Sequence, residues 1–213
     1  MHWDNINWAD QMSALRTKIK SDTTSAEKFK AGDDRCPPDT WKGCIYSDIE
    51  GLISIPSDNL RACRVRAGAK VPVENSRESF KKAMASGILF DLRDIPLSIG
   101  GKFVNIAKCE AVSGDFLAQF EAVKDLGFEL LVKRAKVGMA KHVRVRPMFR
   151  NWSLEVLVTV TEERITQGNL QDIWTNAGLY VGLGDWRPDS PKSPGPHGAF
   201  KAEVFPISAK KVA

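Results

Sequence analysis

The second half of the chain carries the clearest alternation of apolar and polar positions. Residues 153–161 place an apolar side chain at every second position, which predicts a strand with one apolar face. A helical period follows, with Thr166 as its N-cap and Gly178 as its stop. The apolar stripe of this helix is formed by Leu170, Ile173, Trp174 and Ala177. A loop rich in Gly and Pro then leads to a predicted strand over 199–207.

Weaker patterns predict the other elements. An amphipathic helix near the N-terminus, with Trp8, Met12, Leu15 and Ile19 on one stripe, precedes a polar loop over 21–43. A strand over 45–55 then leads into a helix over 58–69. The remaining predicted elements are short helices at 79–85 and 115–123, strands at 88–92, 103–107, 128–132 and 142–146, and a tight turn at Gly100-Gly101.

The order of these elements predicts the fold class. It is that of a β-α-β-β-α-β sheet with its helices on one face. We therefore expect an α+β protein with a ferredoxin-like or RRM-like core and a thumb-like insertion. The predicted divisions are an N-terminal helix and loop (1–43), a core (44–70 and 128–213) and an insertion (71–127). The open face of such a sheet commonly binds nucleic acid.

The charge distribution indicates a polyanionic partner. The net charge is +5 and the pI about 9.0, a moderate excess that says little by itself. Between Leu130 and Leu154, however, there is no acidic residue. The same stretch contains Lys133, Arg134, Lys136, Lys141, Arg144, Arg146 and Arg150. Such a cluster suits a chain of phosphates, although a solvated basic loop has the same composition.

The composition also excludes several classes of protein. An apolar content of 43% supports a folded core, and no apolar run reaches the roughly 18 residues that a membrane span needs. Met1-His2-Trp3-Asp4 lacks the regions of a secretion signal, so we expect a soluble, cytoplasmic protein without a membrane partner. The cysteines match no zinc pattern and are expected to be reduced thiols: Cys36, Cys44, Cys63 and Cys109.

The sequence gives catalysis little support. Asp48 and Glu50 on one strand, together with Asp185 in the Gly-rich loop, are the residues that could hold a magnesium ion for nuclease chemistry. Isolated carboxylates of this kind are usually solvated or paired with cations. No P-loop, GxSxG or HExxH motif occurs. We therefore expect a protein that is not an enzyme and needs no cofactor.

Two segments resemble a known family. The sequence Ile-Pro-Ser-Asp-Asn-Leu-Arg-Ala-Cys at 55–63 is similar to the strand-to-helix entry of the repeat-associated mysterious protein (RAMP) superfamily. Gly178, Gly182 and Gly184, between the last helix and the last strand, resemble that superfamily's Gly-rich loop. Together these segments and their surroundings cover about half of the chain. Phage-encoded proteins ending in a similar Gly-Asp-Trp-Arg-Pro segment share the likeness. The Pro-rich loop at 188–198 and the short chain depart from the family pattern.

The resemblance implies an RNA-binding backbone subunit of a CRISPR-type ribonucleoprotein, assembled with copies of itself or with other subunits. The alternatives are a phage single-strand DNA-binding or annealing protein and a viral protein-interaction module acting on host defence. A glycine loop can point N–H groups at phosphates, although Gly182 and Gly184 could equally form a plain turn and Trp186 could pack in the core. The predicted nucleic-acid-binding residues are Arg61, Arg64, Lys70, Lys81, Lys82, Lys133, Arg134, Lys136, Lys141, His142, Arg144, Arg146, Gly182, Gly184, Trp186 and Arg187.

Overall fold

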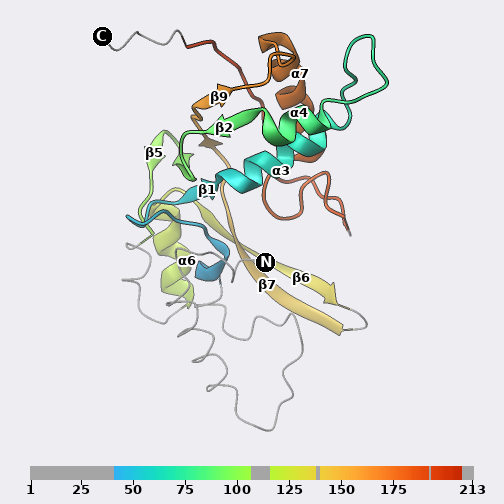
Figure 1. The fold of residues 1–213 in the computed structure, drawn as a ribbon. Coiled ribbons are helices and arrows are strands. Elements are labelled where there is room, and N and C mark those ends of the chain that lie inside the picture. Colours follow the sequence, from blue (N-terminus) through green and yellow to red (C-terminus); the bar gives the residue numbers. More distant parts are fainter. Residues whose placement is uncertain (1–40, 107–115, 138–139, 192, 208–213) are drawn as a thin grey trace, which may run out of the picture. The chain divides into compact units, whose positions relative to one another are not determined.

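The computed structural model describes residues 41–106, 116–137, 140–191 and 193–207 (Figure 1). These residues group into two compact units, each made of two separate chain segments. Unit 1 consists of the described residues of 1–55 and 94–155, and unit 2 consists of those of 56–93 and 156–213. Each unit therefore contains part of the predicted core and part of the predicted insertion. The predicted N-terminal helix lies outside the described residues.

Unit 1 contains one α-helix and most of the strands. The strands form a pair β1-β3, a three-stranded sheet β5-β4-β8, and the long antiparallel hairpin β6-β7. Pro56, the last residue of β1, is assigned to unit 2. The elements are η2 (Lys42–Cys44), β1 (Ser54–Pro56), β3 (Asp94–Pro96), β4 (Ser98–Ile99), β5 (Lys102–Phe103), α6 (Phe116–Asp125), β6 (Glu129–Val137), β7 (Ala140–Met148) and β8 (Trp152–Ser153).

A single apolar cluster forms the interior of unit 1. Its large members are Trp41 and Phe128, whose ring centroids lie 6.1 Å apart. The Trp41 indole Nε1 donates a hydrogen bond of 2.8 Å to Oε1 of Gln119, so the buried indole N–H and the Gln119 oxygen both have a partner. The other buried members are Ile45, Ile53, Leu97, Ile99, Val104, Ile106, Val123, Leu130 and Val145.

Unit 2 is mainly helical. Helix α3 packs against α4, α7 and the π-helical turn η3, while β2 and β9 form a short antiparallel ribbon (Figure 1). Its elements are α3 (Ser57–Gly68), α4 (Lys81–Ser86), β2 (Ile88–Phe90), β9 (Val158–Val160), α7 (Gln167–Asn176) and η3 (Ala177–Val181). The buried apolar residues include Leu60, Cys63, Ala67, Phe80, Met84, Ile88, Leu170, Ile173 and Val181.

The fold is therefore mixed α+β, as expected, with four helices and several small sheets among the described residues. The predicted helices at 58–69, 79–85, 115–123 and 166–177 correspond to α3, α4, α6 and α7. Thr166 is the N-cap of α7, and its hydroxyl accepts a hydrogen bond of 3.2 Å from the Asn169 N–H. The strands are paired two or three at a time rather than in one four-stranded sheet within the described ranges.

The predicted strand over 153–161 is divided into β8 and β9. Leu154 packs against the core of unit 1, whereas the chain enters unit 2 at Val156. Val156 and Leu157 are exposed between the two strands. The alternating pattern thus spans a boundary between two cores, and this explains why one continuous strand does not form. Likewise, the predicted strand over 45–55 is reduced to the last residues before α3.

Helix α7 ends close to the predicted place, with Asn176 as its last residue and Ala177 as its C-cap, but Gly178 does not stop the helical path of the chain. The chain continues through η3 and turns at Gly182, where φ is +72°. Gly178 is buried instead against the backbone of Phe200, and a Cβ atom there would overlap the Phe200 carbonyl oxygen. The absence of a side chain at Gly178 therefore allows the two chain segments to pack closely.

The predicted final strand over 199–207 has no strand partner among the described residues. A side chain takes the place of a neighbouring strand. The amide of Gln171 donates to the Ala202 carbonyl (2.8 Å) and accepts from the Val204 N–H (2.9 Å). In addition, the Phe200 N–H donates to Gly178 O at 3.2 Å. This segment is thereby held along α7. None of the helices in the described ranges has the length and apolarity that a membrane crossing requires.

Candidate nucleic-acid interface

The β6-β7 hairpin carries the basic stretch that stood out in the sequence. Its register runs without interruption from Glu129↔Met148 to Val137↔Ala140. The two strands are longer than the predicted 128–132 and 142–146, because the cationic residues expected between the strands are themselves part of them. Arg134, Lys136, Lys141 and His142 belong to this outer half, where the register pairs Lys136 with Lys141. For these four residues the structure describes the backbone only.

The inner half of the hairpin is anchored by apolar residues. Val145 is fully buried and Leu130 is nearly so, and both belong to the core of unit 1. Arg144 and Arg146, on either side of Val145, are partly exposed. This is the alternation expected for the strand, with valine inward and arginine outward. One face of the hairpin is therefore fixed by the core, and its other face presents cations.

The register brings cations from both strands together. Lys133 lies opposite Arg144, and Arg146 lies opposite Leu131 on the next pair of the same face. Side chains that are directly opposite in an antiparallel pair have Cβ atoms roughly 4.5–5.5 Å apart. Lys133 is exposed and Arg144 is partly exposed. The hairpin thus presents a compact group of positive charges to solvent.

The acidic residue at the base of the hairpin is bound by another cation. Glu129 receives two hydrogen bonds from the Arg150 guanidinium, of 2.9 Å from Nε and 3.1 Å from Nη2. The hydrogen bond from Arg150 is also the main reason why the pKa of Glu129 is lowered. The negative charge of Glu129 is therefore neutralised by Arg150 at the base of the hairpin.

Two predicted phosphate ligands in unit 2 donate hydrogen bonds to backbone carbonyls of the same unit. Arg61 is exposed, and its Nε and Nη2 atoms donate to the Ala85 carbonyl at 3.2 and 3.1 Å. Arg64 is only 1% exposed and donates to the carbonyls of Met84 (2.9 Å) and Ile88 (2.8 Å). Its guanidinium carbon lies 4.7 Å from the centroid of the Phe90 ring. Burial, and then the nearby Arg61 charge, lower the pKa of Arg64 to about 10.

Arg64 is therefore an interior residue, which corrects its prediction as a surface contact. Together Arg61 and Arg64 bind the carbonyls of Met84 and Ala85 at the C-terminal end of α4, and Arg64 also binds Ile88 O in β2. Cations stabilise that end of a helix because its last carbonyls lack partners within the helix.

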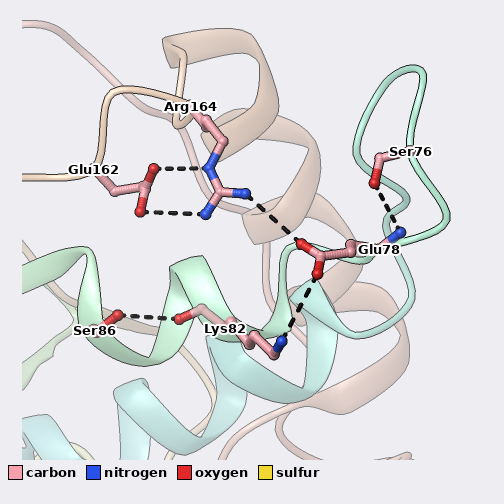
Figure 2. Close-up of polar contacts among 6 residues, drawn as sticks. All are labelled: Ser76, Glu78, Lys82, Ser86, Glu162 and Arg164. Atoms are coloured by element: carbon pink, nitrogen blue, oxygen red, sulfur yellow. Dashed lines mark hydrogen bonds and ion pairs between the residues drawn. The ribbon is translucent and has the colours of Figure 1, made fainter.

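Lys82, also predicted to contact nucleic acid, lies beside a carboxylate. Its Nζ atom lies 3.7 Å from Glu78 Oε1, and the other oxygen of Glu78, Oε2, lies 3.8 Å from Arg164 Nη1 (Figure 2). Arg164 in turn donates a 2.8 Å hydrogen bond to Glu162. Two cations and two carboxylates thus form a neutral surface network. Its neighbour Lys81 is exposed on the first turn of α4.

The Gly-rich loop uses many of its amides internally. The Gly182 N–H donates to Ala177 O at 2.8 Å, and the Leu183 N–H donates to Gly198 O at 2.9 Å. A Cβ atom on Gly182 would approach Pro188 Cδ to 2.8 Å. Gly184, by contrast, is exposed with φ +77° and open space around it. These bonds give Gly182 the role of a tight turn and leave Gly184 as the accessible glycine.

Trp186 and Lys70 lie at the surface of unit 2. Trp186 is 37% exposed, with its ring centroid 5.2 Å from that of His197, so it is not a core residue. Lys70 Nζ lies 5.9 Å from the centroid of the exposed Tyr180 ring. The Arg187 guanidinium donates to Gly184 O at 3.1 Å. Tyr180 was missed in the sequence because nothing in its spacing separates an exposed aromatic residue from a buried one.

The carboxylates considered for metal chemistry do not form a site in the described part of the chain. Asp48 Oδ1 accepts hydrogen bonds from the N–H groups of Glu50 (3.0 Å) and Leu52 (2.8 Å), which closes a turn. Asp185 belongs to the other unit. Across the described ranges, no group of three or more metal-binding side chains is present.

No protein-family model, curated protein or solved structure matches this chain.

Proposed function

We propose that this chain is a non-catalytic protein that binds single-stranded nucleic acid by its phosphate backbone, through the β6-β7 hairpin. The observation that carries the proposal is the cross-strand pair of Lys133 and Arg144, with Arg146 on the next pair of the same face. The surrounding stretch from Leu130 to Leu154 has no acidic residue.

The energetics of the hairpin favour an anionic ligand. Like charges placed directly opposite in an antiparallel sheet repel each other. A phosphate chain lying across the hairpin removes this repulsion and releases its own condensed counterions, which drives binding. The core of unit 1 holds the hairpin through Val145 and Leu130, so the cations are presented on an ordered base.

The resemblance to the RAMP superfamily makes RNA the first partner to test. A ferredoxin-like sheet and assembly with further copies belong to the same hypothesis, but the hairpin argument depends on neither. Phosphate recognition alone does not separate RNA from DNA, whereas a contact with the 2′-hydroxyl does. The experiment therefore needs both strands, together with a duplex as a third ligand.

The test is fluorescence anisotropy with labelled RNA, DNA and duplex 20-mers at several salt concentrations. The variant K133Q/R144Q should weaken binding to both single strands about tenfold or more at low salt. Its slope of log affinity against log salt should fall by about 1.4, since each lost contact removes about 0.7. The matched control is K42Q/K102Q, which removes the same charge from unit 1 outside the hairpin.

The control should retain most of the affinity and the wild-type salt slope. Equal loss in both double variants would mean that net charge, and not the hairpin, drives binding. Unchanged low-salt affinity of K133Q/R144Q would refute the placement of the site. Tighter binding to the duplex than to either single strand would refute the preference for unpaired strands.

A further inference from the structure

Trp186 holds a backbone conformation that is unfavourable for its side chain. Its φ angle is +53°, in the left-handed region where bulky residues are rare. Strain of this kind persists only where the surrounding structure fixes it, and it is often found at binding sites. Trp186 is nevertheless 37% exposed, so burial of the indole does not account for it.

The loop around Trp186 is built to hold it. Gly195 lies so close that a Cβ atom on it would overlap the carbonyl oxygen and the indole ring of Trp186. The His197 N–H donates to Trp186 O at 3.3 Å, and the two rings are in tilted contact. The Gly195 N–H donates to Arg187 O at 3.1 Å. The loop thus supports one side of the indole and leaves part of it accessible to solvent.

A second exposed aromatic residue lies six positions earlier. Tyr180 is 57% exposed and belongs to the π-helical turn η3, a form of helix that is frequent at functional sites. Six residues of chain span at most about 21 Å, so the Cα atoms of the two residues are no farther apart than a few nucleotides of an extended strand. The loop returns to η3, because the Asp189 N–H donates to Val181 O at 3.2 Å.

Cations accompany both rings. Lys70 Nζ lies above the Tyr180 ring, and Arg187 directly follows Trp186 in the chain. Arg66 is nearby as well, in an ion pair of 2.8 Å with Asp189. Aromatic rings interleaved with cations are typical of surfaces that bind single strands, where rings stack on bases and cations contact phosphates. An apolar protein partner would not require the cations.

We propose that Tyr180 and Trp186 stack on unpaired bases, while Lys70 and Arg187 contact the phosphates beside them. This inference rests on the proposed function and adds a second contact surface in unit 2. It also predicts a property that the hairpin alone does not supply, namely that affinity depends on the presence of bases. Because every base has a flat face, the stacking is independent of sequence.

The test compares a thymidine 20-mer with a 20-mer of abasic deoxyribose phosphates. The variants W186L and Y180L should each bind the thymidine strand about tenfold more weakly, the effect of losing one stacked base. Both should bind the abasic strand as the wild type does. W186F should keep most of the affinity, because it retains an aromatic face. F205L is the matched control, since Phe205 is an exposed aromatic residue of unit 2 outside this surface.

The outcomes separate the two proposals. If W186L and Y180L leave thymidine binding unchanged while K133Q/R144Q abolishes it, the stacking inference is wrong and the hairpin remains. If wild-type protein binds neither strand, the proposed function itself is wrong. Equal losses on both strands would contradict stacking, because the abasic strand has no bases. A change of oligomeric mass in W186L with unaltered strand binding would assign this surface to protein contacts and would also overturn the inference.

Discussion

Replacing Arg64 with methionine should destabilise unit 2, although the change removes a charge from an apolar interior. The Arg64 guanidinium donates to the carbonyl oxygens of Met84 at 2.9 Å and Ile88 at 2.8 Å. Methionine matches the aliphatic part of the arginine side chain, and its flexible thioether can pack toward the Phe90 ring in place of the guanidinium. The main change is that two carbonyl groups, Met84 O in α4 and Ile88 O in β2, lose their donors.

The expected loss follows from those two hydrogen bonds. Each bond to a charged group contributes about 1.5–3 kcal/mol, so together they account for about 3–6 kcal/mol. Part of this is offset, because a buried cation is costly and burial lowers the pKa of Arg64 to about 10. Its Nη1 atom also has no hydrogen-bond partner in the described structure. The net destabilisation should therefore be about 2–4 kcal/mol.

R61M is the matched control for R64M. Arg61 is on the same helix and donates to the neighbouring carbonyl of Ala85, but it is exposed. Water can replace its hydrogen bonds, so R61M should cost less than about 1 kcal/mol. The comparison separates burial from the simple loss of an arginine.

Urea unfolding followed by circular dichroism measures the two losses. Amide exchange within α4 gives a local measurement, because R64M should reduce the protection of Lys81–Ser86 more than R61M does. Equal destabilisation by both variants would refute the argument from burial. A stabilised R64M would show that the cost of the buried cation exceeds the value of its bonds.

Three further predictions concern residues that hold unit 2 together. Burial raises the pKa of the Cys63 thiol from 9.0 to about 12, so between these pH values the folded state binds more protons than the unfolded state. The free energy of unfolding should therefore fall as pH rises from 9 toward 12. C63A should reduce this dependence on pH, measured by urea unfolding at several pH values. G182A should destabilise more than G184A, since both have positive φ but only Gly182 lacks space for a Cβ atom, and equal midpoints in thermal unfolding would contradict this. T166A removes the N-cap of α7 and should cost about 1 kcal/mol in urea unfolding, whereas T166S should restore most of it.

Local patterns predicted the helices well and predicted their surroundings poorly. The N-cap at Thr166 depends on neighbours within one turn, and the structure confirms it. The burial of Arg64, by contrast, depends on tertiary packing between α3 and the segment that contains α4 and β2. Arg64 lies on the same helical stripe as Leu60 and Ala67, but a sequence pattern treats an arginine on that stripe as a surface residue. Its interior role becomes visible only when α4 supplies carbonyls that need donors.

The division into two units was also hidden from the sequence. Residues 153–161 alternate as one strand would, yet Leu154 belongs to one core and Val158 to the ribbon of the other unit. Periodicity reports which side chains need burial, but it does not report which core buries them. The same limit applies to the basic stretch, whose composition alone did not distinguish a loop from the two long strands observed.

Local charge density identifies the candidate interface better than net charge does. The +5 total includes cations that the fold already uses: Arg64 holds carbonyls, while Arg66 and Arg150 hold carboxylates. Counting such residues as available cations overestimates the positive charge that the surface offers to a ligand. The hairpin differs because its register gathers Lys133, Arg144 and Arg146 on one face of two paired strands. A chain of phosphates can contact such a group at several points, and each contact releases condensed counterions.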